Sequence, residues 1–326
     1  TILQLSNEQF VQRIRDDGID ILVDLAGYNT STRMSAMALE PAPLLVKWVG
    51  GLINTTGLPA IDYLITDRIE SPLGSDAFYT EKLIRMPDDY VCYLPPPNIP
   101  DVGPLAAWKN GYVTLGCFNN PTKINEVVLE KWAGIMQALP DSRLFLKGGA
   151  YDSAALRRRV QEIMQGHGIA AERLRLEGQS KHYELLACYN DVDVALDPWP
   201  YSGGLTTCEA LLMGVPVVTL PGPTFAGRHS ATHLANAGIP ELVAEDWDQY
   251  QSCVLALASN LDNLSTLRTS LRQTLLDSPV CDGQRYARHL ATALRAIWQR
   301  YCEGKPRASL AFTADGKPWF EDGDAP

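Results

Sequence analysis

One loop combines glycines, hydroxyl groups and a helix start in a pattern suited to binding a diphosphate. It spans residues 198–207 (PWPYSGGLTT) and follows a predicted strand. Gly203 and Gly204 let the backbone approach a ligand closely, while Thr206 and Thr207 offer hydroxyl groups. The apolar residues that come next predict a helix, whose first N–H groups and positive dipole end would face an anion. We therefore predict an anion-binding site at this loop.

The same loop has a simpler structural interpretation. Thr206 and Glu209 stand three residues apart, the spacing of a capping box, which would explain both residues without any ligand. A cap does not require two glycines just before it, so Gly203 and Gly204 favour a ligand. If that ligand is a nucleotide, Glu209 in the first helical turn could accept hydrogen bonds from ribose hydroxyls.

A second polar loop follows the predicted strand at 112–120, where Asn119 and Asn120 end the strand and Lys123 comes three residues later. In an open α/β sheet, ligands bind outside the carboxyl ends of the strands. A lysine there can neutralise a phosphate and the charge that develops on a leaving diphosphate. The alternative is an ordinary solvated lysine at a helix start.

Histidines and nucleotide motifs narrow the choice of chemistry. His229 and His233 have the i, i+4 spacing of a zinc pair, but no third ligand stands at a recognisable spacing. We expect no metal, and we place Arg228 and His229 among the polar groups at the strand ends. The chain contains no GxGxxG, GxxxxGK[ST] or GxSxG motif, which weighs against dinucleotide oxidoreductases, P-loop ATPases and α/β-hydrolases. Polar loops at 27–33 and 54–57 could bind an acceptor or simply turn the chain.

Composition sets the class of protein. The 326 residues correspond to about two domains, and 46% hydrophobic with 20% charged residues is typical of a folded soluble protein. The net charge of −10 argues against nucleic acid binding.

Seven cysteines without a CxxC pair are expected to be reduced thiols. No apolar run is long enough to cross a membrane and no signal peptide is visible, so we expect a cytoplasmic protein without a membrane partner. The chain begins with Thr1 rather than Met, as a fragment would.

Alternating strands and helices must position these loops. Apolar runs at 21–25, 44–50 and 61–67 predict strands, and the proline-rich segment 94–104 predicts an extended connector. Strand and helix patterns then alternate up to about residue 222, which predicts a doubly wound parallel sheet, and the pattern from 248 onward is purely helical. We expect an N-terminal domain at 1–105, a C-terminal domain at 106–302 and a loose tail at 303–326.

Several segments together resemble the catalytic region of the O-linked N-acetylglucosamine transferase family, of the bacterial type. They include DILVDLAGYNTSTR, TTGLPAIDYLITD, GCFNNPTKI, DVALDPWPYSGGLTTCEALLMGVPVVTLPG and GRHSATHLANAGIPELVA, in the family's order over about residues 10–302. The resemblance implies a GT-B fold with two Rossmann-like doubly wound domains facing a cleft. It also implies inverting transfer of N-acetylglucosamine from UDP-N-acetylglucosamine to Ser or Thr of a protein or peptide, without a metal or another cofactor.

The resemblance also assigns roles to residues. Asn120 and Lys123 match a pair that contacts the nucleotide, with Lys123 on the diphosphate. Asp17 matches an acidic residue near the reacting centre, and Glu209 matches one that holds ribose. Where animal members have His-Thr-Thr at the helix start, this chain has Gly204, Leu205 and Thr206. The other residues placed at the nucleotide sugar are Gly203, Gly204, Leu205, Thr206, Thr207, Arg228 and His182. Lys181 and Tyr183, which flank His182, are further candidates for the same contact.

Two alternatives remain open at this stage. The same fold could use another nucleotide sugar, such as a donor of fucose or another hexose, because residues around a nucleotide do not distinguish sugars. The family's first Rossmann strand and a histidine-bearing loop would precede Thr1, so the N-terminal domain is expected to be incomplete. The chain could then be a truncated, non-catalytic binding module.

Overall fold

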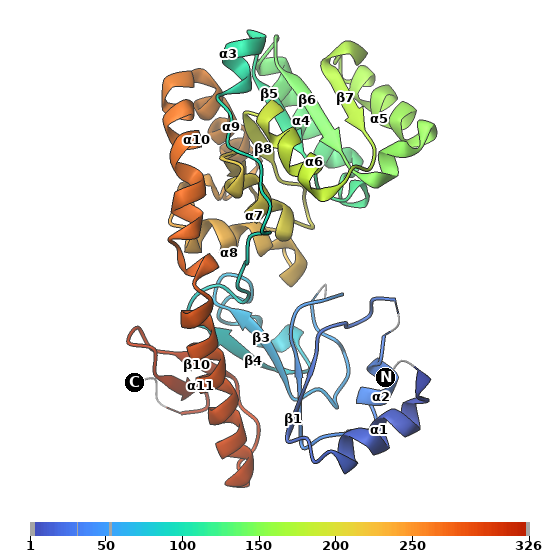
Figure 1. The fold of residues 1–326 in the computed structure, drawn as a ribbon, viewed down its shortest axis with the longest axis vertical. Coiled ribbons are helices and arrows are strands. Elements are labelled where there is room, and N and C mark those ends of the chain that lie inside the picture. Colours follow the sequence, from blue (N-terminus) through green and yellow to red (C-terminus); the bar gives the residue numbers. More distant parts are fainter. Residues whose placement is uncertain (1–3, 31, 52–53, 324–326) are drawn as a thin grey trace. The chain divides into compact units, whose positions relative to one another are not determined.

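The computed structural model describes residues 4–30, 32–51 and 54–323. The chain divides into two compact units (Figure 1). The first contains the residues up to Cys92, residues 224–226 and the segment from Gly283 onward, and the second contains Tyr93–Pro223 and Gly227–Asp282. Each unit has one sheet that is wholly or mainly parallel, which confirms the predicted α/β class. Within the described ranges, no helix combines the length and the hydropathy needed to span a bilayer.

The first unit is built on a six-stranded sheet of order β1-β2-β3-β4-β10-β11, in which only β11 runs antiparallel to its neighbour. Its strands are β1 (Ile21–Asp24), β2 (Leu44–Lys47), β3 (Tyr63–Asp67), β4 (Lys82–Met86), β10 (Leu310–Phe312) and β11 (Pro318–Phe320). Its helices are α1 (Asn7–Asp16), α2 (Met34–Met37) and α11 (Gly283–Cys302).

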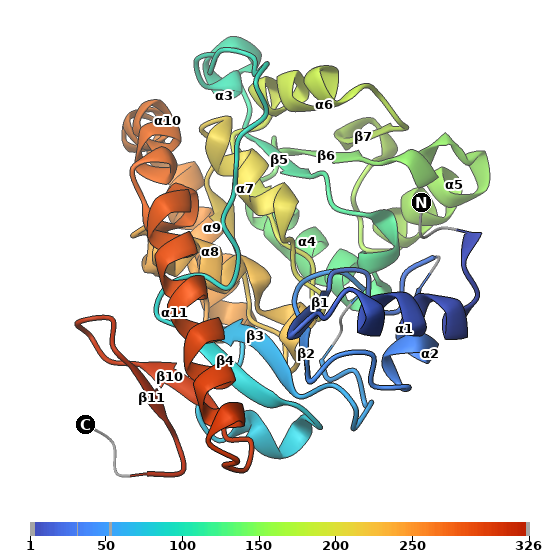
Figure 2. The same ribbon diagram turned by 60° about the horizontal axis from the view of Figure 1, so that its bottom comes forward.

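The two faces of this sheet bury different helices. Side chains alternate along β2, so Leu44 and Val46 join a core with Ala293 and Ile297 of α11. Figure 2 shows α11 running along β4 of the same sheet. Leu45, between them, packs on the other face in a cluster that includes residues of α2. Both faces are therefore covered, as a parallel sheet requires.

The second unit holds a five-stranded parallel sheet of order β7-β6-β5-β8-β9. Its strands are β5 (Thr114–Cys117), β6 (Arg143–Lys147), β7 (Leu174–Glu177), β8 (Val194–Leu196) and β9 (Val217–Val218). Its helices are α3 (Ala106–Asn110), α4 (Glu126–Ala138), α5 (Ala154–Gly166), α6 (His182–Cys188), α7 (Leu205–Leu212), α8 (His229–Asn236), α9 (Trp247–Ser259) and α10 (Leu261–Leu276). The strand order reverses between β5 and β8, which makes the unit doubly wound, as predicted.

Alternation along the strands again assigns the helices to two layers. Leu115 and Cys117 of β5 join the cluster that contains α4, α5 and α9, whereas Phe118 joins the cluster of α6, α7 and α8. Gly116 also faces the second layer, where a Cβ atom would lie 2.6 Å from Val192. The order of the elements from 112 to 276 agrees with the strand and helix pattern in the sequence.

Two expected boundaries are wrong. The division falls between Cys92 and Tyr93, not near residue 105, because the proline-rich connector is bound to the second unit. There the amide of Gly103 donates to Asn190 Oδ1 at 2.8 Å, and Arg272 Nη2 donates to the carbonyl of Pro100 at 2.6 Å. Helix α11, expected in the C-terminal domain, belongs to the first unit, because its apolar side packs on that sheet.

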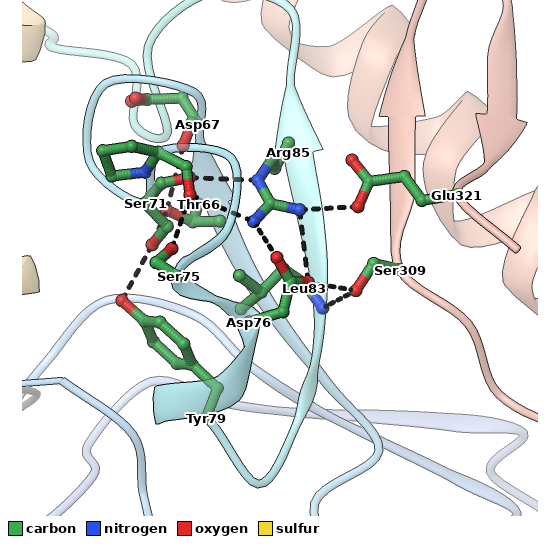
Figure 3. Close-up of polar contacts among 11 residues, drawn as sticks. Thr66, Asp67, Ser71, Ser75, Asp76, Tyr79, Leu83, Arg85, Ser309 and Glu321 are labelled. Atoms are coloured by element: carbon green, nitrogen blue, oxygen red, sulfur yellow. Dashed lines mark hydrogen bonds and ion pairs between the residues drawn. The ribbon is translucent and has the colours of Figure 1, made fainter. Parts of the chain in front are cut away.

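The expected loose tail is also wrong, since β10 pairs with β4 and β11 pairs with β10. The fully buried guanidinium of Arg85 holds this hairpin (Figure 3). Its Nη1 donates to Glu321 Oε2 at 2.8 Å, its Nη2 forms an ion pair with Asp76, and its Nε donates to the carbonyl of Ser71 at 3.0 Å. Ser309 Oγ also donates to Asp76, at 2.8 Å. These three-residue strands were missed because their pattern is too short to be seen in the sequence.

Removal of the charge of Glu321 should loosen the hairpin. We expect Glu321→Gln to make the amides of β10 exchange about tenfold faster, because a hydrogen bond between charged groups is worth about 1.5–3 kcal/mol and an amide keeps part of it. Hydrogen–deuterium exchange with mass spectrometry measures this effect. Asp315→Asn is the matched control, since its ion pair with Lys317 is exposed, and it should leave β10 unchanged. Equal exchange in both variants would contradict the role of Arg85.

Candidate functional site

Two loops of the second unit meet where the strand order reverses. One follows β5 and carries Asn119, Asn120 and Lys123, and the other leads from β8 through residues 197–204 into α7. The crossovers from β5 and β8 leave in opposite directions, which opens a crevice at the carboxyl ends of these strands. The topology therefore brings together the two loops that the sequence singled out.

The buried carboxylate of Asp197 shapes the loop after β8. Its Oδ1 accepts the amide of Gly203 at 2.7 Å, and its Oδ2 accepts the hydroxyl of Thr219 at 2.7 Å. Burial raises the pKa of Asp197 to about 6, although these hydrogen bonds favour the ionised form. Gly203 has no room for a side chain, because a Cβ atom would lie 2.7 Å from the hydroxyls of Thr206 and Thr207.

Hydroxyl groups tie the same loop to α8. Thr207 Oγ1 and Ser230 Oγ lie 2.7 Å apart, and Ser230 Oγ donates to the carbonyl of Gly203 at 2.8 Å. All three residues are buried. Thr207 therefore has a supporting role beneath the loop.

Helix α7 begins at Leu205, and no side chain caps it at Gly204. The capping box of Thr206 and Glu209 is therefore wrong. Thr206 Oγ1 instead donates to Asn119 Oδ1 at 3.0 Å, which links the helix start to the end of β5. Leu205 is 60% exposed. The residue before α7 is therefore a glycine, and no N-cap side chain accepts a hydrogen bond from the first amides of the helix.

Lys123 lies against the loop after β8. Its Nζ donates to the carbonyl of Ser202 at 2.7 Å and lies 3.9 Å from the centre of the Tyr201 ring. Burial lowers the pKa of Lys123, and the charge of Asp197 opposes this effect. A half-buried ammonium therefore lies beside the glycine pair. The sequence left open whether this lysine lies at the site or is an ordinary solvated lysine.

Asn120 has a local role in the structure. Its Oδ1 accepts the amide of Thr122 at 3.1 Å, which caps the short turn Pro121–Lys123. The side chain of Asn120 is exposed, whereas that of Asn119 is buried against Thr206. The asparagine that joins the two loops is therefore Asn119, and Asn120 orders the turn that carries Lys123.

His182 and Glu209 form a close pair. His182 begins α6, and its Nε2 lies 2.6 Å from Glu209 Oε1. The Glu209 side chain is 5% exposed and that of His182 is 52% exposed. Burial raises the pKa of Glu209, and the contact with His182 opposes that shift. Both residues of this pair were predicted at the nucleotide, but their contact was not.

The start of α8 places His229, rather than Arg228, beside the glycine pair. A Cβ atom at Gly204 would lie 3.9 Å from His229 Cδ2, and the Tyr201 and His229 rings are 6.0 Å apart. Burial lowers the pKa of His229 to about 3, so its imidazole is neutral. Arg228 Nη1 lies 3.5 Å from the carbonyl of Gly222. No group of three His, Cys, Asp or Glu side chains in the described part of the chain could hold a metal ion.

Asp17 belongs to the first unit. It caps the C-terminus of α1, and its carboxylate accepts Arg13 Nε at 2.9 Å. The polar loops after β1 and β2 lie in the same unit, and Tyr28 donates from its hydroxyl to the carbonyl of Thr56 at 2.6 Å. These two loops are therefore joined at the carboxyl edge of that sheet.

Several residues of the site carry no clear signal in the sequence. A carboxylate directly after an apolar strand is the one hint of Asp197, because such an end lies at the ligand-binding edge. The others act through contacts between distant segments. Asp197 and Ser230 were missed, whereas Asn119, Tyr201 and Ser202 lie in the two loops that the sequence singled out but were given no role there.

The arrangement is suited to a phosphate group. An uncapped helix N-terminus presents amides and the positive end of its dipole, and Lys123 adds a charge beside it. Gly204 has no side chain, so nothing from this residue covers the approach to these groups. A carboxylate and a histidine lie one helical turn further on, at hydrogen-bonding distance from each other.

Comparison with known proteins assigns a family to this arrangement. The model of glycosyl transferase family 41 matches residues 4–93 and 109–290. A relative from Petunia hybrida, described as a probable UDP-N-acetylglucosamine–peptide N-acetylglucosaminyltransferase SPINDLY, is 38% identical over 304 residues. The match covers 93% of this chain and 32% of the relative, so the chain spans about a third of the length of the curated relatives.

Solved structures agree with this result. A mutant of the Thermobaculum terrenum O-GlcNAc transferase superposes with a TM-score of 0.86 and 40% identity, covering 92% of this chain and 57% of that one. Sucrose-phosphate synthase from Thermosynechococcus elongatus reaches a TM-score of 0.61 at 15% identity, covering 90% of this chain and 77% of that one, and shares the fold. The two-sheet architecture is that of GT-B glycosyltransferases, as the sequence predicted.

The two glycines should respond differently to the same substitution. We expect Gly203→Ala to destabilise the loop by about 2 kcal/mol, because the new methyl group would overlap Thr206, Thr207 and Asp197. Gly204→Ala is the matched control, since its methyl group would make only ordinary contact with His229. Hydrogen–deuterium exchange of the α7 amides measures both effects. Equal losses in the two variants would contradict the tight packing at Gly203.

His229 should make the stability of the second unit depend on pH. Its folded pKa of about 3 lies below the ordinary value of 6.5, so unfolding takes up a proton as the pH falls below 6.5. We expect this histidine to lower the free energy of unfolding by about 1.4 kcal/mol between pH 7.5 and pH 5.5. His229→Gln should remove that part of the dependence. Urea titration with pulsed hydrogen exchange on α7 and α8 peptides gives the comparison, and parallel pH profiles would rule the effect out.

Proposed function

Because this chain belongs to glycosyl transferase family 41, we propose that its protein transfers N-acetylglucosamine from UDP-N-acetylglucosamine to a Ser or Thr hydroxyl of a protein or peptide. The plant relatives, which are about 38% identical, are described as probable UDP-N-acetylglucosamine–peptide N-acetylglucosaminyltransferases. The match covers about a third of the length of those relatives, so the proposal concerns the region that the chain shares with them.

The proposed reaction is a single displacement with inversion at the anomeric carbon. The acceptor oxygen attacks from the face opposite the diphosphate, the bond between the anomeric carbon and the β-phosphate oxygen breaks, and UDP leaves. The acceptor hydroxyl loses its proton to a base. The negative charge that develops on the leaving diphosphate is where protein groups can lower the barrier most.

The observation that carries the proposal is Lys123 beside the uncapped start of α7. The ammonium is held 2.7 Å from the carbonyl of Ser202, so it is already in place before the leaving group becomes charged. The first amides of α7 add fixed dipoles aimed at the same anion. Preorganised charges of this kind stabilise a transition state without rearrangement during the reaction. Protein groups thus supply the positive charge that this scheme requires, without a metal.

The pair of His182 and Glu209 supports a nucleoside beside the diphosphate. A buried carboxylate in the second turn of α7 can accept ribose hydroxyls, and His182 at 2.6 Å limits where the carboxylate can turn. Where animal members have His and Thr, this chain has Gly204 and Leu205, and Leu205 is exposed and apolar. The hydroxyl of Thr206 donates its one proton to Asn119, so the proposed phosphate contacts in the first turn come from backbone amides.

The acceptor is proposed to engage the first unit. Its joined loops after β1 and β2 expose the side chains of Leu25 and Tyr28, which are 54% and 58% exposed. An exposed apolar and aromatic pair beside polar loops is suited to a peptide backbone with mixed side chains. Asp17 remains a proposed residue near the reacting centre.

Calorimetry with UDP tests the donor site. We expect Lys123→Ala to weaken UDP binding about 10- to 100-fold, because a charged hydrogen bond to phosphate is lost, and Thr206→Ala to weaken it by less. Lys109→Ala is the matched control, since this lysine is exposed on α3. UDP affinity that stays the same in all three variants would overturn the assignment of Lys123.

The transferred sugar identifies the reaction. Proteins co-expressed with the full-length gene product should gain an N-acetylhexosamine, measured by mass spectrometry, and Lys123→Ala should abolish the gain. A deoxyhexose or hexose increment would assign a different nucleotide sugar to the same site. UDP binding without any transfer would favour a binding module over an enzyme.

A further inference from the structure

Tyr201, in the loop after β8, places its ring face against the ammonium of Lys123. The ammonium is 3.9 Å from the centre of the Tyr201 ring, well within the range of a cation–π contact. The next residue, Ser202, accepts the Nζ hydrogen bond at 2.7 Å. Two consecutive residues of one loop therefore hold the ammonium, one with a ring face and one with a carbonyl.

The charges around Lys123 show why a ring face matters there. Burial disfavours its ammonium, and the charge that favours it is the carboxylate of Asp197, directly after β8. His229, whose ring centre lies 6.0 Å from that of Tyr201, is neutral because burial lowers its pKa to about 3. The Tyr201 ring thus adds attraction for the ammonium without adding charge.

On the basis of the function proposed above, we infer that Tyr201 is a positioning residue that holds the Lys123 ammonium ready for the diphosphate of the nucleotide sugar. A lysine has three N–H donors, and the carbonyl of Ser202 occupies one of them. The ring face attracts the charge without fixing a particular N–H direction, so the ammonium can turn its other donors toward phosphate oxygens. A second carboxylate at this place would hold the ammonium as well, but it would repel the diphosphate.

The inference predicts that the electrons of the ring, not its hydroxyl, matter. Tyr201→Phe keeps the ring face and should behave like the wild type in every measurement of Lys123. Tyr201→Leu removes the ring. A fluorinated phenylalanine at position 201 keeps the shape but withdraws electrons from the ring face, which separates the cation–π contact from packing. Tyr112→Leu is the matched control, because Tyr112 forms a comparable contact with Arg143 elsewhere in the unit.

Competitive acetylation of lysines, read by mass spectrometry on the peptide containing Lys123, measures the ammonium directly and needs no substrate. Removal of the ring face disfavours the charged form, so the leucine and fluorinated variants should lower the pKa of Lys123 by about half a unit or more. The phenylalanine and Tyr112→Leu variants should leave it unchanged. The fluorinated variant also covers the case in which Tyr201→Leu does not fold.

Calorimetry with UDP then connects the ring to the donor site. We expect the leucine and fluorinated variants to bind UDP about 3- to 10-fold more weakly, and to have no further effect in a Lys123→Met background. The inference is overturned if the phenylalanine, leucine and fluorinated variants all have the same Lys123 pKa and the same UDP affinity. If the wild type does not bind UDP, the proposed function fails, while the acetylation measurement still decides whether the ring holds Lys123.

Discussion

A carboxylate removed from water must find hydrogen-bond donors, and at Asp197 these donors are the amide of Gly203 and the hydroxyl of Thr219. Gly203 stands six positions after Asp197, so satisfying the carboxylate folds the intervening chain back onto the end of β8. That fold-back determines where the glycine pair lies and where α7 starts. It also makes glycine necessary at position 203, because the loop passes too close to Thr206 and Thr207 for a Cβ atom.

The strand order of the second unit adds the second half of the site. The loops after β5 and β8 are far apart in the sequence, yet these strands are neighbours in the sheet. Thr206 reaches Asn119 across 87 residues, and Lys123 reaches Ser202 across 79. A chain with a net charge of −10 can therefore present a local group of positive charge and dipoles. The electrostatics of the site depend on topology rather than on composition.

Local patterns predicted the parts of this fold that depend on local physics. Apolar periodicity located the strands and helices of the second unit, and glycines and prolines located its loops. Contacts at long range escaped prediction. The ion pairs of Arg85 that hold the C-terminal hairpin, and the packing of α11 on the first sheet, involve residues far apart in the chain. The spacing of Thr206 and Glu209 suggested a cap, but Asn119 and His182 compete for these side chains and determine where they lie.

The charge of a diphosphate explains why Gly204, and not a capping residue, stands directly before α7. Lys123 carries a single positive charge, so the ammonium alone cannot offset a diphosphate with two negative charges. The amides at the start of α7 must then provide much of the attraction. A serine or aspartate cap would occupy one of those amides and, with aspartate, add a negative charge. Glycine keeps the amides open to a ligand and costs only a few tenths of a kcal/mol relative to a capping side chain.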